Sequence, residues 1–319
     1  MKILFTADWH IKLGQKNVPI PWARDRYYKL FEQLHAAEAN VDIHIIGGDI
    51  FDKLPSMEEL EIFFDFVSKV SITTYIYSGN HEALKKNTTF LTSLKKVVSR
   101  INPLVFIIDD YFTLGNSILD IIPYNKLKEY HPGDIDFHAP ILCTHVRGEI
   151  PPHVKPEVPL ELFERWQVVL AGDLHSYDNC QRNILYPGSP VTTSFHRSEV
   201  DTGYIILDTD TLEHEWIKLD VPQLIRKTVK AGEEMPATEY HHTIYEVEGD
   251  MSELSSVSDN GLIDKKIVKR STDTALILDP NLSMAEEVTE YARYILMLEE
   301  PTIDKVLKEY SNHEAKHSI

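Results

Sequence analysis

Five short segments of this 319-residue chain each place carboxylate, imidazole or amide side chains directly after an apolar run. Ionisable side chains at the ends of hydrophobic strands are costly to bury unless they are paired or bound to a metal. Packing alone gives no reason to repeat such an arrangement five times, so the sequence predicts one shared metal site. The segments are Asp8-Trp9-His10, Gly47-Gly48-Asp49, Gly79-Asn80-His81, Thr144-His145 and Gly172-Asp173-Leu174-His175.

The first half of the chain alternates between strand and helix patterns. Strands separated by helices imply βαβ units and a mainly parallel sheet. After residue 103 the pattern changes to short strands, which predicts an α/β fold of two sheets in a sandwich flanked by helices. Ser56 and Glu59 have the spacing of a capping box at a helix start. The early strands are expected at 2–7, 42–46 and 73–77, and the helices at 22–39, 56–69 and 88–99.

Val221-Pro222 is the expected boundary between the first domain and a smaller one. Residues 1–220 then form the sandwich, and residues 221–282 form a small α+β domain. Residues 283–319 are expected to contain two helices, at 283–298 and 302–310, separated by a break at Pro301 and followed by a loose tail.

The candidate ligands fit two metal ions. In open α/β sheets, sites form outside the carboxyl ends of the strands, where all five segments are expected. Residues two apart on an extended strand end face the same way, so Asp8 and His10 can reach one ion. With Asp49 as a bridge, each ion receives four ligands. One set is Asp8, His10, Asp49 and His175, and the other is Asp49, Asn80, His145 and Asp173.

Two metals roughly 3.5–4 Å apart can clamp the attacking and leaving oxygens of a displacement at phosphorus. His81 is next to a ligand but surplus to this count. It is therefore free to hydrogen-bond the scissile phosphate or to protonate the leaving oxygen. A lone Asp-X-His or Gly-Asn-His would be weak evidence, because such pairs also occur as surface residues or turns. The ordered set after successive strands carries the prediction.

Charge and composition limit the class of partner. The net charge of −18 argues against broad non-specific nucleic-acid binding, which usually shows a basic surface. A nucleic-acid substrate stays possible if metals or a partner subunit supply positive charge. No apolar run reaches 18 residues, so no membrane-spanning helix is expected. Cys143 and Cys180 make no disulfide framework, which favours a reducing cytoplasm.

The ordered motifs resemble the signature of calcineurin-like metallophosphoesterases. Within that group, two stretches resemble SbcD, the nuclease subunit of the SbcCD complex, and the resemblance covers residues 1–218. It implies the calcineurin-like sandwich, with residues 221–282 as a capping domain, and His81 as the phosphate-handling histidine. The two stretches are Gly47-Gly48-Asp49-Ile50-Phe51-Asp52 and Tyr186-Pro187-Gly188-Ser189-Pro190, followed by Ser194-Phe195.

The resemblance also implies an activity and partners. It implies two divalent metals, manganese first and magnesium second, and a DNA nuclease with 3′-to-5′ exonuclease and endonuclease activity. Such an enzyme would act with an SbcC-like coiled-coil ATPase in DNA repair, recombination or end processing.

Two residues depart from the family pattern. Asp173 stands where the family usually has histidine, and Glu82 follows His81 where aspartate is common. A carboxylate at 173 can still ligate and favours manganese or magnesium, but it also leaves open an altered second metal site. The reduced helical region at 283–310 would suit a compact viral member working in the host cytoplasm.

Two questions stay open on the residues alone. The chain could be a calcineurin-like phosphatase or cyclic-nucleotide phosphodiesterase, or a metal-poor scaffold, instead of a nuclease. The helices expected at 58–70 and 88–99 carry more apolar residues than one core-facing stripe requires. Family members dimerise through this region, which implies a homodimer. Burial of both helices against the sheet explains the pattern equally well.

Overall fold

The computed structural model describes residues 1–84, 88–115, 117–132, 138–258, 261–268, 282–296 and 298–317. Contacts between residues divide the chain into two compact units. Unit 1 consists of Met1–Val229, Glu234–Glu246 and Asp259–Lys265, and unit 2 of Lys230–Glu233, Val247–Ser258 and Lys266–Ile319. All the candidate ligands belong to unit 1.

The first sheet of unit 1 has six strands in the order β11-β10-β1-β2-β3-β4. Strands β1 to β4 run parallel, as the alternation of strands and helices predicts. The later hairpin of β10 and β11 extends the sheet, because β10 pairs antiparallel with β1. The bounds are β1 Lys2–Thr6, β2 Ile43–Ile46, β3 Thr73–Tyr77, β4 Val105–Ile108, β10 Gly203–Asp208 and β11 His214–Lys218.

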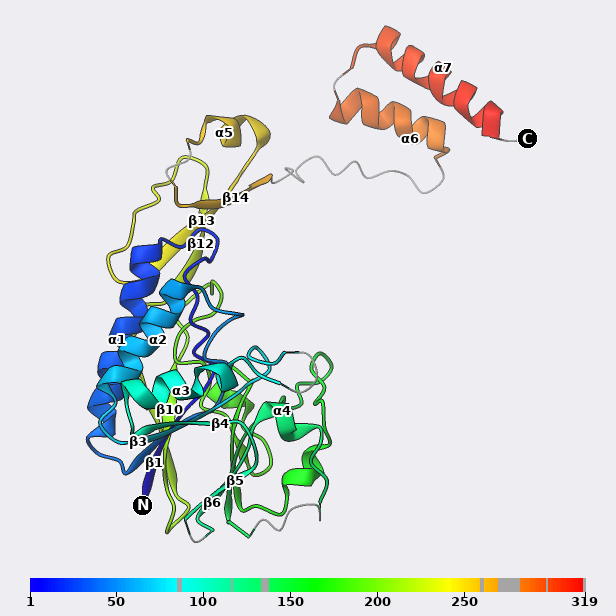
Figure 1. Ribbon diagram of the computed structural model, residues 1–319. Helices are drawn as coiled ribbons and strands as arrows, with labels where there is room; N and C mark the ends of the chain where they lie inside the picture. The colour runs from blue at the N-terminus through cyan, green and yellow to red at the C-terminus, as the bar shows by residue number, and fades with distance from the viewer. Residues whose placement is uncertain are drawn as a thin grey trace. The chain divides into compact units, whose positions relative to one another are not determined.

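Three helices cover one face of this sheet: α1 Ile20–Glu38, α2 Met57–Lys69 and α3 Leu91–Ile101 (Figure 1). Strand residues alternate between the faces. Leu4 packs in the core under the helices, whereas its neighbours Ile3 and Phe5 pack in the core between the sheets. The predicted capping box is confirmed, since the Ser56 hydroxyl accepts from the Glu59 N–H and Glu59 accepts from the Ser56 N–H.

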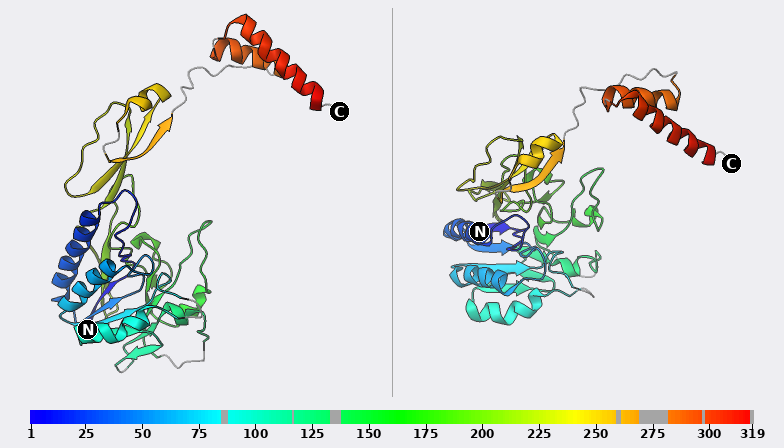
Figure 2. Two further views of the ribbon diagram at one scale, coloured as in Figure 1. Left: turned by 45° about the horizontal axis from the view of Figure 1, so that its top comes forward. Right: turned by 90° about the horizontal axis from the view of Figure 1, so that it is seen from above.

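The second sheet has five strands in the order β5-β6-β7-β8-β9. Its inner face packs against the first sheet, where the Tyr77 hydroxyl donates to the carbonyl of Thr144 at 2.9 Å. Figure 2 shows the green segments that carry this sheet on the side away from α1 to α3. The bounds are β5 Phe112–Leu114, β6 Leu119–Ile122, β7 Ile141–His145, β8 Val168–Gly172 and β9 Ile184–Leu185, with short helices α4 Tyr124–Leu127, η1 Leu160–Phe163 and η2 Tyr177–Asn179.

The predicted α/β two-sheet sandwich is therefore confirmed. A three-stranded sheet of β12, β13 and β14 follows residue 221. Within the described ranges, no helix is long and apolar enough to cross a bilayer. The remaining bounds are β12 Leu224–Lys230, β13 His242–Gly249, α5 Met251–Ser256, β14 Ile263–Val268, α6 Met284–Glu290, a π-helical turn Tyr291–Ile295 and α7 Glu300–His317.

One expectation for the C-terminal region is wrong, namely the loose tail from residue 313. Residues 313–317 continue α7, because the sequence there holds no glycine or proline to end a helix. The two separate helical segments expected here are present, the first ending at Ile295 and the second beginning at Glu300, so that Pro301 occupies the first turn of α7. A proline at that position removes an N–H that has no partner within the helix in any case.

Candidate metal centre

The loops after five strands bring the candidate ligands of both sheets to one place. The carboxyl ends of β1, β2 and β3 come from the first sheet, and those of β7 and β8 come from the second. Because the two sheets pack face to face with these ends together, residues more than 100 positions apart become neighbours. The side chains are Asp8 and His10 after β1, Asp49 after β2, Asn80 and His81 after β3, His145 at the end of β7, and Asp173 and His175 after β8.

Asp49 lies at the centre of this cluster. Its Oδ2 atom is 3.5 Å from Nε2 of His145, 3.7 Å from Nε2 of His10 and 3.9 Å from Nε2 of His81. The side chain is 2% exposed, so these imidazoles, and not solvent, surround its carboxylate. This central place is the one that a bridging ligand requires.

The other candidates complete two groups around Asp49. On one side, the Nε2 atoms of His10 and His175 are 3.0 Å apart. On the other side, Nε2 of His145 is 3.0 Å from the Asn80 side-chain oxygen and 3.9 Å from Oδ1 of Asp173. The structure thus brings together every residue that the sequence singles out. Sets of potential ligand atoms within 4.8 Å of one another occur in Asp8/His10/His175, Asp8/Asp49/His145 and His10/Asp49/His81.

The backbone at four of these residues is strained. Their φ angles are positive, in a region of backbone conformation that residues other than glycine rarely adopt. The values are 58° at Asp8, 45° at His10, 51° at Asp49 and 103° at Asp173. Such conformations persist only where the surrounding structure enforces them, and they concentrate at functional sites. The fold therefore holds these candidate ligands in place through the backbone as well as through packing.

Two glycines allow the loops to approach one another. A Cβ atom on Gly79 would lie 2.2 Å from Oδ1 of Asp49, and one on Gly48 would lie 2.4 Å from the Gly79 backbone nitrogen. Gly48 also has a φ angle of 86°. Since real Cβ contacts are never so short, both positions require a residue without a side chain.

The charges of the cluster fit a bound cation. Asp8 and Asp49 are buried, yet within the described residues neither carboxylate contacts a lysine or arginine. Their hydrogen bonds come from the backbone N–H groups of Asp173 and His81. Burial raises the pKa of Asp8 well above its usual range. Burial would lower the pKa of His145, but Asp49 raises it to about 10. The centre therefore favours positive charge, which divalent metals would supply.

The surroundings of the Asn80 amide oxygen also favour a positive charge at the centre. Its amide oxygen faces His145 Nε2, and it lies 2.9 and 3.2 Å from the two Asp49 carboxylate oxygens. His145 Nδ1 is 2.8 Å from the Gly47 carbonyl, so Nδ1 carries a proton. Turning the amide would let its NH₂ group donate to Asp49, whereas a cation requires the oxygen to point inward.

Comparisons with known proteins identify the family. A family model described as calcineurin-like phosphoesterase matches residues 1–177. The probable exonuclease subunit 1 of Escherichia phage T5 is 44% identical, over 96% of this chain and 97% of that protein. The chain belongs to the calcineurin-like phosphoesterase family.

Two further relatives refine this assignment. The SbcD subunit of the nuclease SbcCD of Staphylococcus saprophyticus is 22% identical, over 65% of this chain and 65% of that protein. The putative phosphoesterase 244L of Invertebrate iridescent virus 6 is 25% identical, over 73% of this chain and 86% of that protein. The expected resemblance to SbcD-type and viral members is confirmed, and this phosphoesterase is a hydrolase of phosphoester bonds.

Glu82 joins the loop that carries Asp49 to the loop that carries Asn80. It is fully buried, and its carboxylate accepts from the backbone N–H groups of Asp49, Phe51 and Gly79 at 2.8–3.0 Å. Burial and the charge of Asp49 raise its pKa, and the bonds from Phe51 and Gly79 oppose the rise. The sequence shows Glu82 only as a departure from the family aspartate. Its position beside Asn80 and His81 was the available signal.

Replacing Glu82 with alanine should destabilise the protein by at least ~3 kcal/mol, because it leaves three buried N–H groups without acceptors. Urea denaturation followed by circular dichroism measures this loss. Glu58→Ala, at an exposed position of α2, removes the same side chain and should change stability by less than ~0.5 kcal/mol. Equal midpoints for the two variants would show that Glu82 does not support the loops.

A buried chain of hydrogen bonds fixes Trp9, which lies between two candidate ligands. The Trp9 indole N–H donates to the Thr6 hydroxyl at 3.1 Å, and that hydroxyl lies 3.0 Å from Nε2 of His44. His44 in turn contacts Glu38 through Nδ1 at 3.2 Å. Burial would raise the pKa of Glu38, but hydrogen bonds from His35 and His44 lower it to about 2. Glu38 therefore accepts, and the Thr6 hydroxyl donates to His44.

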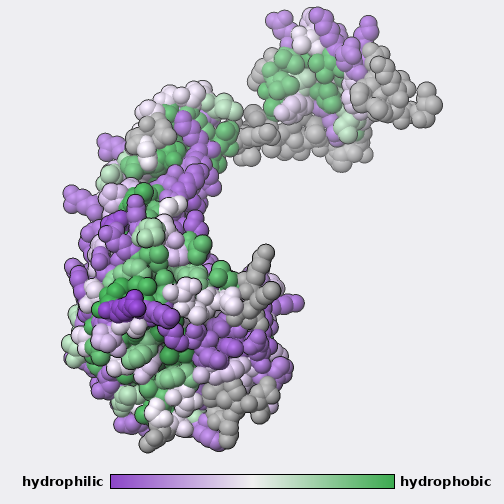
Figure 3. All heavy atoms as spheres, in the orientation of Figure 1, coloured by the Kyte–Doolittle hydropathy of each residue, from purple (hydrophilic) through white to green (hydrophobic). Residues whose placement is uncertain are grey.

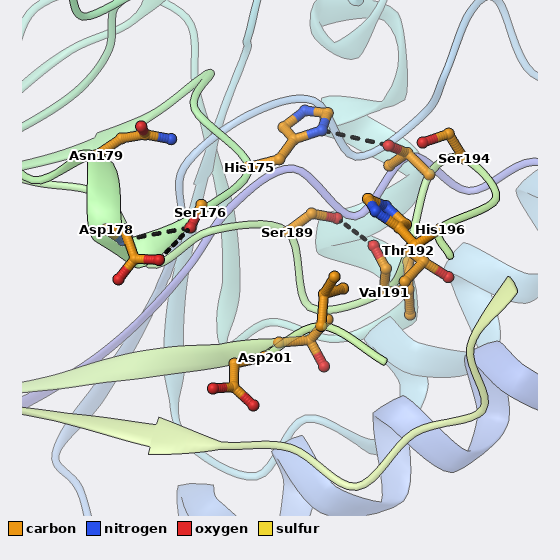
Figure 4. A pocket seen from close by; sticks show the side chains of 13 residues that line it. His175, Ser176, Asp178, Asn179, Ser189, Val191, Thr192, Ser194, His196 and Asp201 are labelled. Atoms are coloured by element: carbon orange, nitrogen blue, oxygen red, sulfur yellow. Dashed lines mark hydrogen bonds between the residues drawn. The ribbon is translucent and has the colours of Figure 1, made fainter. Parts of the chain in front are cut away.

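An arginine and a pocket adjoin the centre. Arg147 forms two hydrogen bonds with the Asp173 carboxylate. A pocket of about 460 Å³ opens beside His175 (Figure 4). The Thr193 hydroxyl lies 3.3 Å from Nδ1 of His175. Among the described residues that line this pocket are Asp178 and Asp201, and none is lysine or arginine.

Proposed function

We propose that this chain is the nuclease subunit of a DNA-processing complex. It would hydrolyse DNA phosphodiester bonds with 3′-to-5′ exonuclease and endonuclease activity, in repair, recombination or end processing. The observation that carries this proposal is the 44% identity to a probable exonuclease subunit over nearly the whole chain. The match to an SbcD nuclease subunit supports the same substrate class.

The proposed metal ligands are those of the sequence analysis. Asp8, His10, Asp49 and His175 would hold one divalent ion, and Asp49, Asn80, His145 and Asp173 would hold the other. Bound manganese or magnesium would supply positive charge to the phosphate and lower the pKa of water. Carboxylate and amide oxygens in this ligand set support these hard metals.

His81 is the proposed catalytic histidine. Its Nδ1 atom lies 2.6 Å from the Asp52 carbonyl, which assigns the proton to Nδ1 and fixes the ring. The side chain is 35% exposed, unlike the buried His10 and His145. A phosphate at the centre could therefore reach it, which supports a role in binding the phosphate or protonating the leaving oxygen.

The proposed partners are DNA and an SbcC-like coiled-coil ATPase. Both nuclease relatives are named as subunits, which supports a multi-chain assembly. We also propose the domain division after residue 220, with residues 283–319 as a possible contact for the partner. The absence of a disulfide between Cys143 and Cys180 supports a reducing location, the cytoplasm of a cell or viral host.

A homodimer through α2 and α3 is part of the proposal. Most apolar residues of α2 face the core, yet Met57 is 79% exposed, and Val97 and Ile101 of α3 are 42% and 37% exposed. Figure 3 shows hydrophobic side chains beside strongly hydrophilic ones where α3 lies in Figure 1. Apolar side chains left outward on both helices support an interface there.

Light scattering at micromolar concentration should give the mass of two chains, each 36.7 kDa. Val97→Glu should shift this mass to that of one chain, because a carboxylate would be buried in the interface. Thr211→Glu, in the exposed turn between β10 and β11, adds the same charge and should leave the dimer intact. A monomer at every concentration of the unaltered protein would contradict the interface.

Cleavage assays decide between the nuclease and its alternatives. The full chain is incubated with manganese and either linear double-stranded DNA, single-stranded DNA or p-nitrophenyl phosphate, with a chelator as control. Metal-dependent DNA cleavage is expected. Hydrolysis of the phosphomonoester alone would favour a phosphatase. Failure to bind metal, measured by mass spectrometry of the eluted ions, would favour a scaffold.

A further inference from the structure

Arg147 lies at the edge of the centre, and the ligand assignment leaves it unused. Its Nε donates to Oδ2 of Asp173 at 3.0 Å, and its Nη2 donates to Oδ1 at 3.2 Å. Oδ1 of Asp173 also lies 3.9 Å from Nε2 of His145. The arginine side chain is 44% exposed, whereas the aspartate is only 5% exposed. One buried carboxylate therefore connects the cluster to an accessible guanidinium.

The Arg147 guanidinium has N–H groups that are not used in its hydrogen bonds to Asp173. An arginine side chain carries five N–H groups in a planar fork that matches a carboxylate or a phosphate. Asp173 takes two of them, and no other acceptor in the described part of the chain is hydrogen-bonded to Arg147. Because Asp173 fixes the plane of the fork, a second anion could bind the remaining N–H groups with little further loss of side-chain freedom.

The acidic neighbours of Arg147 are Asp173 and Glu157, whereas the described lining of the pocket beside His175 holds acidic residues and no lysine or arginine. The pocket beside His175 carries Asp178 and Asp201 and would repel an anion (Figure 4). Another nearby cation is Lys12, which pairs with Asp52 at 2.8 Å and is 29% exposed. In a chain with a net charge of −18, Arg147 is thus the more accessible of these two cations held beside the centre.

We propose that Arg147 binds a phosphate group of the substrate beside the metal centre and that Asp173 positions it. The residue at 173 then has two roles, since its carboxylate faces the cluster through Oδ1 and holds the arginine through both oxygens. Asp173, which stands where the family usually has histidine, would thus create the phosphate site by holding the Arg147 guanidinium in place. The proposal rests on the proposed function in that the phosphate tested is that of DNA.

The test measures DNA binding rather than cleavage. A fluorescein-labelled duplex is titrated with manganese-loaded His81→Ala protein, which should bind but not cut, and anisotropy gives the dissociation constant at several salt concentrations. Adding Arg147→Gln should raise this constant about tenfold, as expected for losing a hydrogen-bonded charge. The slope of log K against log salt should fall by about 1. Arg147→Lys should keep the salt slope, because the charge is retained. It should still bind the duplex more weakly, because lysine lacks the planar guanidinium fork.

Arg182→Gln is the matched control, since Arg182 is an exposed arginine paired with Glu161 and Glu164. It should change neither the affinity nor the slope. Equal binding by the Arg147 and Arg182 variants would overturn the proposal. A loss of bound manganese in Arg147→Gln would also overturn it, because the arginine would then act only by orienting Asp173. If His81→Ala protein with Arg147 intact does not bind DNA at all, the proposed function fails instead.

Discussion

Asp49→Ala should abolish binding of both metal ions. Among the described residues, Asp49 is the only candidate ligand that lies within 4 Å of histidines from β1, β3 and β7 at once. Without its carboxylate, each proposed ligand set keeps three members and loses a shared negative charge. Metal content measured after dialysis should fall from two ions per chain to nearly none. DNA cleavage should fall by roughly 10⁴-fold, since the metals supply several kcal/mol of transition-state stabilisation.

A thermal shift gives this prediction a readout that is independent of cleavage. Binding of manganese to the folded state should raise the melting temperature of the unaltered protein, but not that of Asp49→Ala. Asp52→Ala is the matched control, because Asp52 lies on the same loop and its side chain pairs with Lys12. It should keep both ions. Two ions per chain in Asp49→Ala would show that Asp49 does not bridge the metals.

His81→Ala should give the opposite pattern, with both metals retained and cleavage reduced by roughly 10²–10⁴-fold. This range is typical for loss of a general acid or base. His81 could instead be a metal ligand, because its Nε2 atom lies 3.9 Å from Asp49 and its ring belongs to a potential ligand group with His10. Metal content therefore decides between the roles of catalyst and ligand.

His175→Ala serves as the comparison for His81→Ala. His175 has its Nε2 atom 3.0 Å from that of His10 and is a proposed ligand. Its replacement should lower the metal content as well as the rate. If His81→Ala also loses an ion, then His81 is a ligand and another group must handle the phosphate.

Local signals predict most of the fold of unit 1. The capping box at Ser56 and Glu59 sets the start of α2, and its partners are only three residues apart. The core strands β1 to β3 are short apolar runs bounded by polar residues, so their existence and order follow from the sequence. The C-terminal helix was less predictable, because the proline at its first turn resembles a break in the sequence pattern.

The candidate site was predictable for a different reason. Parallel strands place their carboxyl ends together, so ligands after successive strands must converge whatever the details of packing. No comparable rule predicts the residues that support the candidate ligands, such as Glu82 and Arg147. Glu82 acts on backbone groups of Asp49 and Phe51 more than 30 positions earlier, and Arg147 acts on Asp173, 26 positions later. Such pairings depend on the path of loops, which a single sequence does not specify.

The close approach of Gly48 and Gly79 has a consequence for reading mutational maps of this protein. Neither residue offers a side-chain atom to a metal or a substrate, yet a methyl group at either would displace the backbone or the Asp49 carboxylate. In a saturation scan scored by cleavage, both should be as intolerant as His145 or Asp49. Intolerant positions in such a map would therefore be of two kinds, those that must supply a ligand atom and those that must leave a volume empty.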